Sequence, residues 1–265
     1  LLAPDKRVAR SPRSYNSQVG VPLSVWQIDE ATDIALIEAG ISRMGEMKRL
    51  QRIIRPTIGL LTNLGGAHQE NFVNELDKCR EKLELCRDCE VVIYNNDDPL
   101  IAQAVELSVQ TAREIAWSRQ NSDKPLYIAS VAKGENSTTI RYNYLGLPGE
   151  YTIPFTDEAS VENSIHCLAV CLYLMVPAER IAERMAMLEP VAMRLEVKEG
   201  KNGCTLINDT YNADIASLDI ALDFMARRPE REGRERVLIL SDLLQTGENS
   251  RALYRKVAAL AESRG

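Results

Sequence analysis

The chain alternates short apolar runs with longer amphipathic segments, which is the pattern of an α/β protein. The apolar runs predict buried strands over Asp33–Ala39, Thr57–Thr62 and Glu90–Tyr94. Between and after these runs, apolar residues recur at helical spacing among many charges. That spacing predicts helices over Gly45–Ile54, Glu70–Cys86 and Pro99–Val109. Because strands and helices alternate, we expect βαβ units and a mostly parallel sheet.

The pattern becomes β-rich after Pro125. Strands are expected over Leu126–Ala132, Thr138–Tyr144 and Tyr151–Pro154, with turns at Gly134–Asn136 and Gly146–Gly149. Connections this short favour antiparallel strands at the edge of the sheet. Helical spacing then returns over Ser160–Leu174 and Ala178–Leu188.

A domain boundary is predicted near Glu189–Pro190, which divides the chain into residues 1–189 and 190–265. Beyond it the strand and helix patterns alternate again. They predict a strand over Cys204–Asn208, a helix over Ile215–Arg227, a strand over Arg236–Leu240 and a helix over Ser250–Ser263. This order indicates the first half of a doubly wound, Rossmann-like domain.

Composition narrows the class of protein. The 265 residues are 45% hydrophobic and 26% charged, which is typical of a soluble globular protein. The net charge of -6 gives no basic footprint for a nucleic acid, so none is expected as a partner. The longest apolar run, Cys167–Val176, is too short to span a membrane, and a cytoplasmic location is expected by default.

The six cysteines are expected to be reduced thiols, since they are too sparse for a disulfide framework. Cys86 and Cys89 have the spacing of a zinc knuckle, but no second pair follows and the chain has only two histidines. We therefore do not expect zinc. His166, Cys167 and Cys171 lie on an apolar helical segment and are interpreted as core residues.

Glu38 and His68 are the most informative chemical pair, because each follows an apolar strand-like run. Ligands of open α/β sheets collect outside the carboxyl ends of the strands. A carboxylate and an imidazole there suggest a nucleotide and metal site. The competing interpretations are an acidic residue that ends a strand and a hydrogen-bonded structural histidine.

Three longer segments, Ser14–Trp26, Gly45–Phe72 and Ile207–Phe224, resemble the Mur ligase family. The likeness covers nearly the whole chain and is strongest to the member that adds D-alanyl-D-alanine to UDP-N-acetylmuramoyl-tripeptide. It implies a central ATP-binding domain over residues 1–189 and a C-terminal domain over 190–265. It also implies ATP and Mg²⁺ as cofactors and an acyl-phosphate intermediate. Leu238–Glu248 is similar to the form fused to an alanine racemase.

The resemblance assigns the catalytic and metal-binding roles to three residues. Glu38 and His68 match the magnesium ligands, and Lys82 matches the lysine that becomes a carbamate and binds the metal as an anion. A carbamate requires a neutral amine first, hence a depressed pKa. On the pattern alone, Lys82 would belong to a solvated helix face, and Lys78 is the alternative if the register differs.

The resemblance also assigns binding roles. Asn163 matches the residue that contacts adenine, and its alternative role is a helix cap. Arg194 matches the arginine that contacts the phosphates, and its alternative is an ordinary surface arginine. Asp209 matches the residue that binds the ribose or orients the hinge, and its alternative is an Asx turn. Asn16 and Ser17 match residues of the segment that faces the UDP-sugar peptide. Tyr211, Asn212 and Ser217 match residues that line the cleft for the incoming dipeptide or support it.

A departure from the family pattern leaves alternatives open. The family's Gly-rich phosphate loop ending in Gly-Lys-[Ser/Thr] is expected upstream of Leu1, so the chain resembles an internal fragment that would be inactive alone. The other readings are a Mur-type or folylpolyglutamate-type ligase that adds a single amino acid, and a non-catalytic binding or scaffold remnant. A nicotinamide-binding module is disfavoured because no Gly-x-Gly-x-x-Gly follows a predicted strand.

Overall fold

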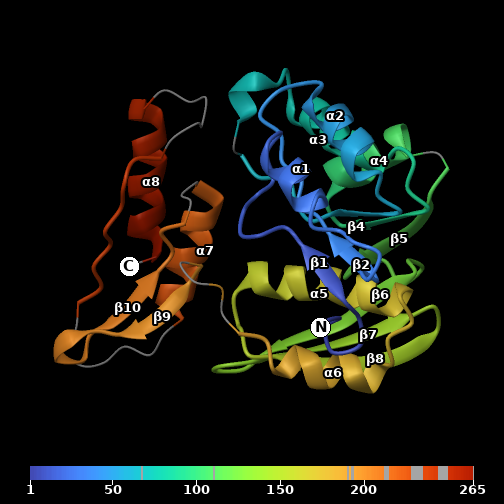
Figure 1. Ribbon diagram of the computed structural model, residues 1–265. Helices are drawn as coiled ribbons and strands as arrows, with labels where there is room; N and C mark the ends of the chain where they lie inside the picture. Colours follow the sequence, from blue (N-terminus) through green and yellow to red (C-terminus); the bar gives the residue numbers. More distant parts are fainter. Residues whose placement is uncertain are drawn as a thin grey trace.

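The computed structural model describes residues 1–66, 68–109, 111–189, 191, 194–211, 215–227, 235–243 and 250–264. Figure 1 shows a larger lobe, drawn blue to yellow, beside a smaller C-terminal lobe drawn orange to red. In chain order the larger lobe begins with β1 (Val8–Arg10), α1 (Gly20–Val25), β2 (Ile34–Leu36), α2 (Glu46–Ile54), β3 (Ile58–Leu61), the 3₁₀ turn Gln69–Asn71, α3 (Glu75–Leu83) and the 3₁₀ turn Glu84–Cys86. It continues with β4 (Val91–Asn95), α4 (Pro99–Ser108), β5 (Arg113–Ser118), β6 (Leu126–Lys133), β7 (Thr138–Tyr144), β8 (Leu147–Ile153), α5 (Glu158–Tyr173) and α6 (Ala178–Ala186).

The central sheet has six strands in the order β3-β4-β5-β6-β7-β8. The strands β3, β4, β5 and β6 are parallel neighbours, while β7 and β8 continue the sheet in antiparallel pairing. The prediction of a mostly parallel sheet with a β-rich edge is therefore confirmed. The strand β5 was not predicted, because its first two residues are charged and exposed and only its last four are buried.

Helices cover both faces of this sheet. Along β4, Val91 and Ile93 pack into a core cluster that includes residues of α5 and α6. The alternate residues Val92 and Tyr94 pack into a second cluster with residues of α3 and α4. Because side chains alternate across a strand, a strand covered on both faces reads as one continuous apolar run. This burial explains why the pattern identified β4 so clearly.

The turn between β7 and β8 differs from the prediction. Tyr144 pairs with Leu147, so the chain reverses at Leu145 and Gly146, which have φ of 52° and 90°. Two successive residues with positive φ form the tight hairpin turn whose twist matches that of the strands. The predicted turn at Gly146–Gly149 was wrong, and β8 instead begins at Leu147.

The strand predicted over Asp33–Ala39 is only partly present. The strand β2 covers three of these residues, pairs in parallel with β1 and belongs to a separate two-stranded sheet. Its side chains are half-buried or exposed, with Leu36 45% exposed. The expectation of a buried strand was therefore wrong. An apolar run is buried only where neighbouring strands and a covering layer exist.

Two helical predictions also change at their ends. The segment Glu70–Cys86 is broken where Phe72 becomes extended, and α3 begins after Asn74, whose side chain accepts a hydrogen bond from the Asp77 amide. The helix predicted from Ser160 begins at Glu158 instead. The short helix α1 was not predicted; it begins at Gly20 within the stretch Ser14–Pro22, which on its composition alone reads as a turn-rich loop, and it ends at Val25.

The smaller lobe contains β9 (Glu196–Glu199), the 3₁₀ turn Lys201–Gly203, β10 (Thr205–Asn208), α7 (Ile215–Ala226) and α8 (Ser250–Arg264). The two strands form an antiparallel pair. A strand was predicted over Arg236–Leu240, but the described residues 235–243 contain none. Ile239 is 91% exposed there. The lobe has its own apolar cluster of Leu218, Leu222, Leu243, Leu253 and Val257.

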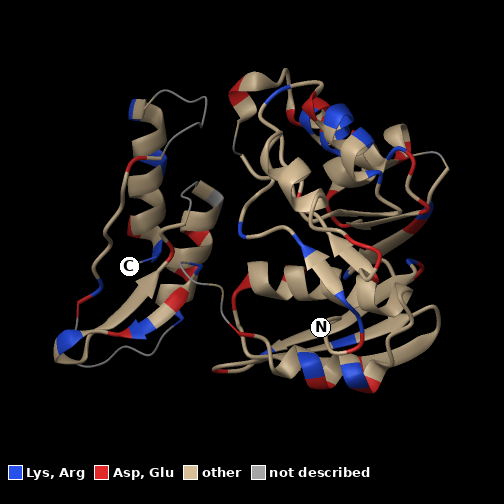
Figure 2. Ribbon diagram, in the orientation of Figure 1, with Lys and Arg blue, Asp and Glu red and all other residues tan. Residues whose placement is uncertain are grey.

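Charges of both signs are distributed over both lobes, as Figure 2 shows. A local concentration of basic residues lies on α2, where Lys48, Arg49 and Arg52 are exposed. The absence of a nucleic-acid partner stays a prediction. In the part of the chain that the structure describes, no helix is long and apolar enough to cross a bilayer.

We predict that Gly59→Ala destabilises the protein. A Cβ atom at Gly59 in β3 would lie 2.5 Å from the Cys86 sulfur and 3.3 Å from the Cys89 sulfur. Both cysteines are buried, so relieving this clash should reduce the free energy of unfolding by about 1–3 kcal/mol. Urea unfolding measures the loss. Gly65→Ala is the matched control, because its added Cβ would meet nothing within 4 Å.

The cause of the loss can be checked by a double variant. Cys86→Ala removes the nearer sulfur, so Gly59→Ala should be less destabilising in that background than in the original protein. Equal losses in both backgrounds would mean that the clash with Cys86 is not the cause.

Candidate functional site

Two of the predicted site residues meet where the chain leaves β2. The Nδ2 atom of Asn16 donates a 2.7 Å hydrogen bond to Oε1 of Glu38. The backbone reinforces this contact, because the Gly40 amide donates to the Asn16 carbonyl at 2.8 Å. A Cβ at Gly40 would lie 3.2 Å from the Asn16 carboxamide, a tight contact that would displace this side chain by a few tenths of an ångström. The loop carrying Asn16 therefore holds one oxygen of an exposed carboxylate.

Lys82 of α3 is half-buried and lies within electrostatic range of the same carboxylate. Burial lowers the pKa of Lys82, while the charges of Cys79 and Glu38 act in the opposite direction. An amine buried beside a carboxylate can exist as the ammonium paired with that carboxylate or as the neutral base. The neutral base is the form that adds carbon dioxide. Asn16 thus contacts Glu38, and the charge of Glu38 acts on Lys82, so the group draws on three separate segments of the chain.

Lys78, the alternative to Lys82, has a different environment. Its Nζ atom donates a 2.6 Å hydrogen bond to the Gly65 carbonyl oxygen, and its side chain is buried. Burial and the nearby charge of Lys82 lower the pKa of Lys78. A carbonyl oxygen accepts a hydrogen bond from an amine but repels the oxygens of a carbamate. This contact favours Lys82 over Lys78 as the modified lysine.

His68 lies in the loop that follows β3. Its backbone has φ of 61°, and its carbonyl accepts the Asn71 amide at 3.1 Å in the 3₁₀ turn that follows. The side chain is half-buried. Among the described residues, no hydrogen bond or ion pair joins His68 to Glu38 or Lys82. The metal-binding role of His68 stays a prediction.

Ser17 has a local structural contact. Its hydroxyl accepts a hydrogen bond from the Gly20 amide at 3.1 Å, at the first turn of α1.

Asn163 lies exposed on α5, in the second turn of that helix. The helix is capped by Asp157, whose carboxylate accepts the Ser160 amide at 2.7 Å. The alternative role of Asn163 as a helix cap was therefore wrong.

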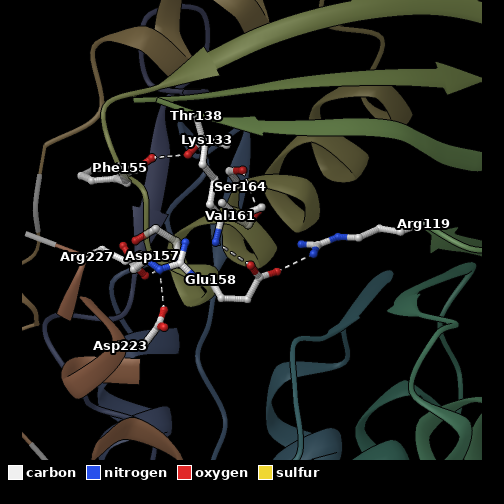
Figure 3. Close-up of polar contacts among 11 residues, drawn as sticks. Arg119, Lys133, Thr138, Phe155, Asp157, Glu158, Val161, Ser164, Asp223 and Arg227 are labelled. Carbon is white, nitrogen blue, oxygen red and sulfur yellow. Dashed lines mark hydrogen bonds and ion pairs between the residues drawn. The ribbon is translucent and has the colours of Figure 1, made fainter. Parts of the chain in front are cut away.

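The sequence did not identify a charged cluster at the start of α5. The Glu158 carboxylate lies between Arg119 and Lys133, with Lys133 Nζ at 2.9 Å from Oε2 (Figure 3). Burial opposes ionisation of Glu158, but the hydrogen bonds from Lys133 and Arg119 hold its pKa below the usual range. Nε and Nη2 of Arg119 have no hydrogen-bond partner among the described residues. The three side chains carry no motif, so only their packing reveals the cluster.

Glu158 also borders the space between the lobes. A cavity of about 340 Å³ is lined by Lys133, Asp157 and Glu158 of the larger lobe and by residues of α7 and α8. Asp223 of α7 and Arg227, the residue after that helix, are paired at 2.8 Å and face Asp157 across it in Figure 3. The two lobes therefore meet across a charged cavity.

The predicted residues of the C-terminal part form a second group. The Arg194 guanidinium carbon lies 4.2 Å from the centre of the Tyr211 ring, a cation–π contact. The Asp209 carboxylate accepts the Leu195 amide at 3.2 Å, which ties the end of β10 to the start of β9. Ser217 is half-buried on α7. Asn212 lies outside the described residues.

The Asn16–Glu38–Lys82 group fits a magnesium ion. Mg²⁺ is usually held by one or two carboxylates, with phosphate oxygens and waters filling its other positions. Glu38 supplies one carboxylate, and a carbamate on Lys82 would supply a second anion beside it. Two adjacent anions repel each other, and a divalent cation between them removes that repulsion. The described residues contain no group of three or more His, Cys, Asp or Glu side chains suited to a metal.

Comparison with known proteins identifies the family. Residues 4–171 match the model of the Mur ligase middle domain. The chain belongs to the Mur ligase family. The match covers β1 to most of α5, and so includes Asn16, Glu38, His68, Lys82 and Asn163.

The sequence relatives extend this similarity beyond the middle domain. The UDP-N-acetylmuramoyl-tripeptide--D-alanyl-D-alanine ligase of Bacillus subtilis is 26% identical over 263 residues, which are 98% of this chain and 55% of the relative. The ligase of the same name from Mycobacterium bovis is 27% identical over 272 residues, with 98% and 52% covered. The chain spans about half the length of the curated relatives it matches.

Solved structures agree on the fold. MurF from Acinetobacter baumannii superposes with a TM-score of 0.85 at 20% identity, covering 99% of this chain and 56% of that chain. The MurF ligase of Thermotoga maritima in complex with ADP gives a TM-score of 0.81 at 20% identity, with 98% and 59% covered. These structures confirm the predicted α/β architecture of a Mur ligase.

Proposed function

We propose that the protein, at its full natural length, is an ATP-dependent ligase that adds D-alanyl-D-alanine to UDP-N-acetylmuramoyl-tripeptide. The observation that carries the proposal is the Glu38 carboxylate, which Asn16 orients through a hydrogen bond and whose charge acts on the half-buried amine of Lys82. The sequence relatives that span 98% of this chain bear the name of this activity. Their similarity favours the dipeptide-adding ligase over ligases that add a single amino acid.

The chemistry of the group suits this reaction. The terminal carboxylate of the tripeptide would attack the γ-phosphorus of ATP, which releases ADP and forms an acyl phosphate. The amine of the dipeptide would then attack the acyl carbon, and the amide forms as phosphate and a proton leave. Mg²⁺, when bound, neutralises phosphate oxygens that would otherwise repel the incoming carboxylate. Glu38 would hold the metal, Asn16 would orient Glu38, and Lys82 as a carbamate would supply the second anion.

The other assignments extend this proposal. Asn163 would contact adenine, Arg194 the phosphates and Asp209 the ribose, while Ser17, Tyr211, Asn212 and Ser217 would line substrate sites. The separate apolar cluster of the smaller lobe supports two domains, 1–189 and 190–265. ATP and a UDP-linked precursor as substrates favour a cytoplasmic location. A fused alanine racemase stays a prediction from Leu238–Glu248.

The test is an acceptor comparison. The full-length protein is incubated with ATP, Mg²⁺, UDP-N-acetylmuramoyl-tripeptide and either D-alanyl-D-alanine or single amino acids. Phosphate release and the mass of the nucleotide product are measured. We expect a product enlarged by the dipeptide. Turnover only with a single amino acid would overturn the assignment, and no turnover with any acceptor would support a non-catalytic role.

Asn16→Ala should impair the use of magnesium. The substitution removes the 2.7 Å hydrogen bond that orients Glu38, so we expect turnover to fall by about 10–100-fold and half-saturation to require more Mg²⁺. The measurement is initial rate against Mg²⁺ concentration. The exposed Asn71→Ala is the control. A raised KM for the nucleotide-linked peptide at unchanged Mg²⁺ dependence would instead place Asn16 in the substrate site.

A further inference from the structure

Cys86 and Cys89 form a buried pair of thiols that the proposed reaction does not use. Both are free, with exposed fractions of 3% and 5%. They lie at the end of the 3₁₀ turn that follows α3, under β3. The residues between them, Arg87 and Asp88, are exposed, so the pair lies one layer beneath the surface.

The backbone places the two residues at the separation that a disulfide requires. The Cys89 amide donates to the Cys86 carbonyl at 3.1 Å, which closes a four-residue turn. In such a turn the first and last Cα atoms lie within about 7 Å, and most disulfides join Cα atoms about 4.4–6.8 Å apart.

The side chains point to the same space. A Cβ built on Gly59 would lie 2.5 Å from the Cys86 sulfur and 3.3 Å from the Cys89 sulfur, so both sulfurs occupy the volume that this glycine leaves open. The interaction of the two thiols, together with burial, raises the pKa of Cys86, and the same interaction lowers the pKa of Cys89. Cys89 also donates to the Pro56 carbonyl at 3.3 Å. The two thiols are therefore chemically different, with Cys89 the better nucleophile.

We propose that Cys86 and Cys89 are a redox-active dithiol that a hydroperoxide converts to an intramolecular disulfide. The Cys89 thiolate attacks the O–O bond, takes one oxygen as a sulfenic acid and releases the alcohol or, from hydrogen peroxide, water. The Cys86 thiol then attacks the Cys89 sulfur, and the S–S bond forms as water leaves. Two electrons and two protons pass from the thiols to the hydroperoxide. A thiol reductant reverses the step.

The other cysteines provide internal comparisons. Cys204 is exposed and belongs to the smaller lobe, while Cys79 is buried one helical turn from Lys82 in the same apolar cluster as the pair. Simple exposure therefore predicts that Cys204, or the likewise exposed Cys167, oxidises first. The proposal instead predicts a specific link between Cys86 and Cys89.

The test uses the full-length protein with hydrogen peroxide as the probe. Remaining thiols are blocked with N-ethylmaleimide, and the denatured protein is digested with trypsin. Cleavage after Arg87 separates Cys86 from Cys89, so a disulfide appears as two linked peptides, Leu83–Arg87 and the peptide beginning at Asp88. We expect this linked pair, together with a loss of about 2 Da from the intact mass, the two thiol hydrogens. Dithiothreitol should restore both peptides.

Single variants separate a specific pair from general oxidation. Cys86→Ser should leave a Cys89 sulfenic acid that dimedone traps, whereas Cys204→Ser should form the linked pair as before. Circular dichroism confirms that each variant is folded. Three outcomes would each overturn the proposal. The first is that Cys204 oxidises while Cys86 and Cys89 still react with N-ethylmaleimide. The others are a link between Cys79 and Cys86, and zinc bound across the pair in the purified protein.

Discussion

Lys82→Ala should reduce ligase turnover by about 100-fold or more while leaving the protein folded. Burial lowers the pKa of Lys82 although the charge of Glu38 acts in the opposite direction, and a lowered pKa is what carbamate formation requires. Removing a group that holds or orients a metal typically costs at least this much activity. A small carboxylate such as acetate should enter the space left by the truncated side chain and restore part of the turnover. Initial rates with and without acetate measure both effects.

Two variants separate the carbamate from packing. Lys82→Met keeps most of the volume of the side chain without the amine, so it should lose turnover without recovering it in acetate. Lys78→Ala removes the hydrogen bond to Gly65 but leaves Lys82 intact, and acetate should not rescue it. Rescue of Lys78→Ala, with Lys82→Ala unaffected by acetate, would move the modification to Lys78. Full activity of Lys82→Ala would remove this residue from the mechanism.

The apolar pattern predicted elements well where the structure surrounds them. The strand β4 was evident because both of its faces are covered. The same kind of run failed at β2, which pairs only with β1, and at Arg236–Leu240, where the described residues form no strand. The hydrophobicity of a residue indicates how much its burial would stabilise the fold. It does not indicate whether a neighbouring strand is present to bury it.

The sequence also predicted the residues of the candidate site better than their contacts. The resemblance selected Asn16, Glu38 and Lys82 one at a time, as residues with separate roles. Their relative positions depend on how the segments before α1, after β2 and within α3 are arranged, which no local pattern encodes. The hydrogen bond from Asn16 to Glu38 gives Asn16 a supporting role that its expected substrate contact did not suggest. The cluster around Glu158 was missed for the same reason, because its three members come from distant segments.

His166 links the core of the larger lobe to the end of β3. Trp117 Nε1 donates to His166 Nδ1 at 3.1 Å, and His166 Nε2 lies 3.0 Å from the Thr62 carbonyl oxygen. The indole nitrogen can only donate, so Nδ1 carries no hydrogen and Nε2 donates to Thr62. His166 and Cys171 are buried, as the sequence indicated, whereas Cys167 is exposed. The neutral ring thus joins β5 to the strand that leads to His68.

The burial of this neutral ring predicts lower stability in acid. Burial lowers the pKa of His166 to about 4, while a histidine in the unfolded chain has a pKa of about 6.5. Between these values the unfolded state binds a proton that the folded state does not, so stability rises with pH in this window. The contribution is complete above about pH 6.5 and is lost as the pH falls toward 4. At pH 5 the expected loss is about 2 kcal/mol.

His166→Phe isolates this contribution. The ring is similar in shape but cannot titrate, and it leaves the Trp117 N–H and the Thr62 carbonyl without their partner. We expect a reduction of about 2–4 kcal/mol in the free energy of unfolding at pH 7.5, because the buried Trp117 N–H loses its acceptor and the Thr62 carbonyl loses its donor. Urea unfolding at pH 7.5 and pH 5 measures the difference between the two proteins at each pH. All other titrating groups are the same in the original protein and in His166→Phe. The difference in free energy of unfolding between the two proteins should therefore be about 2 kcal/mol smaller at pH 5 than at pH 7.5. A gap independent of pH would show that His166 binds its proton equally in the folded and unfolded states, and the assignment of a neutral ring between Trp117 and Thr62 would fail.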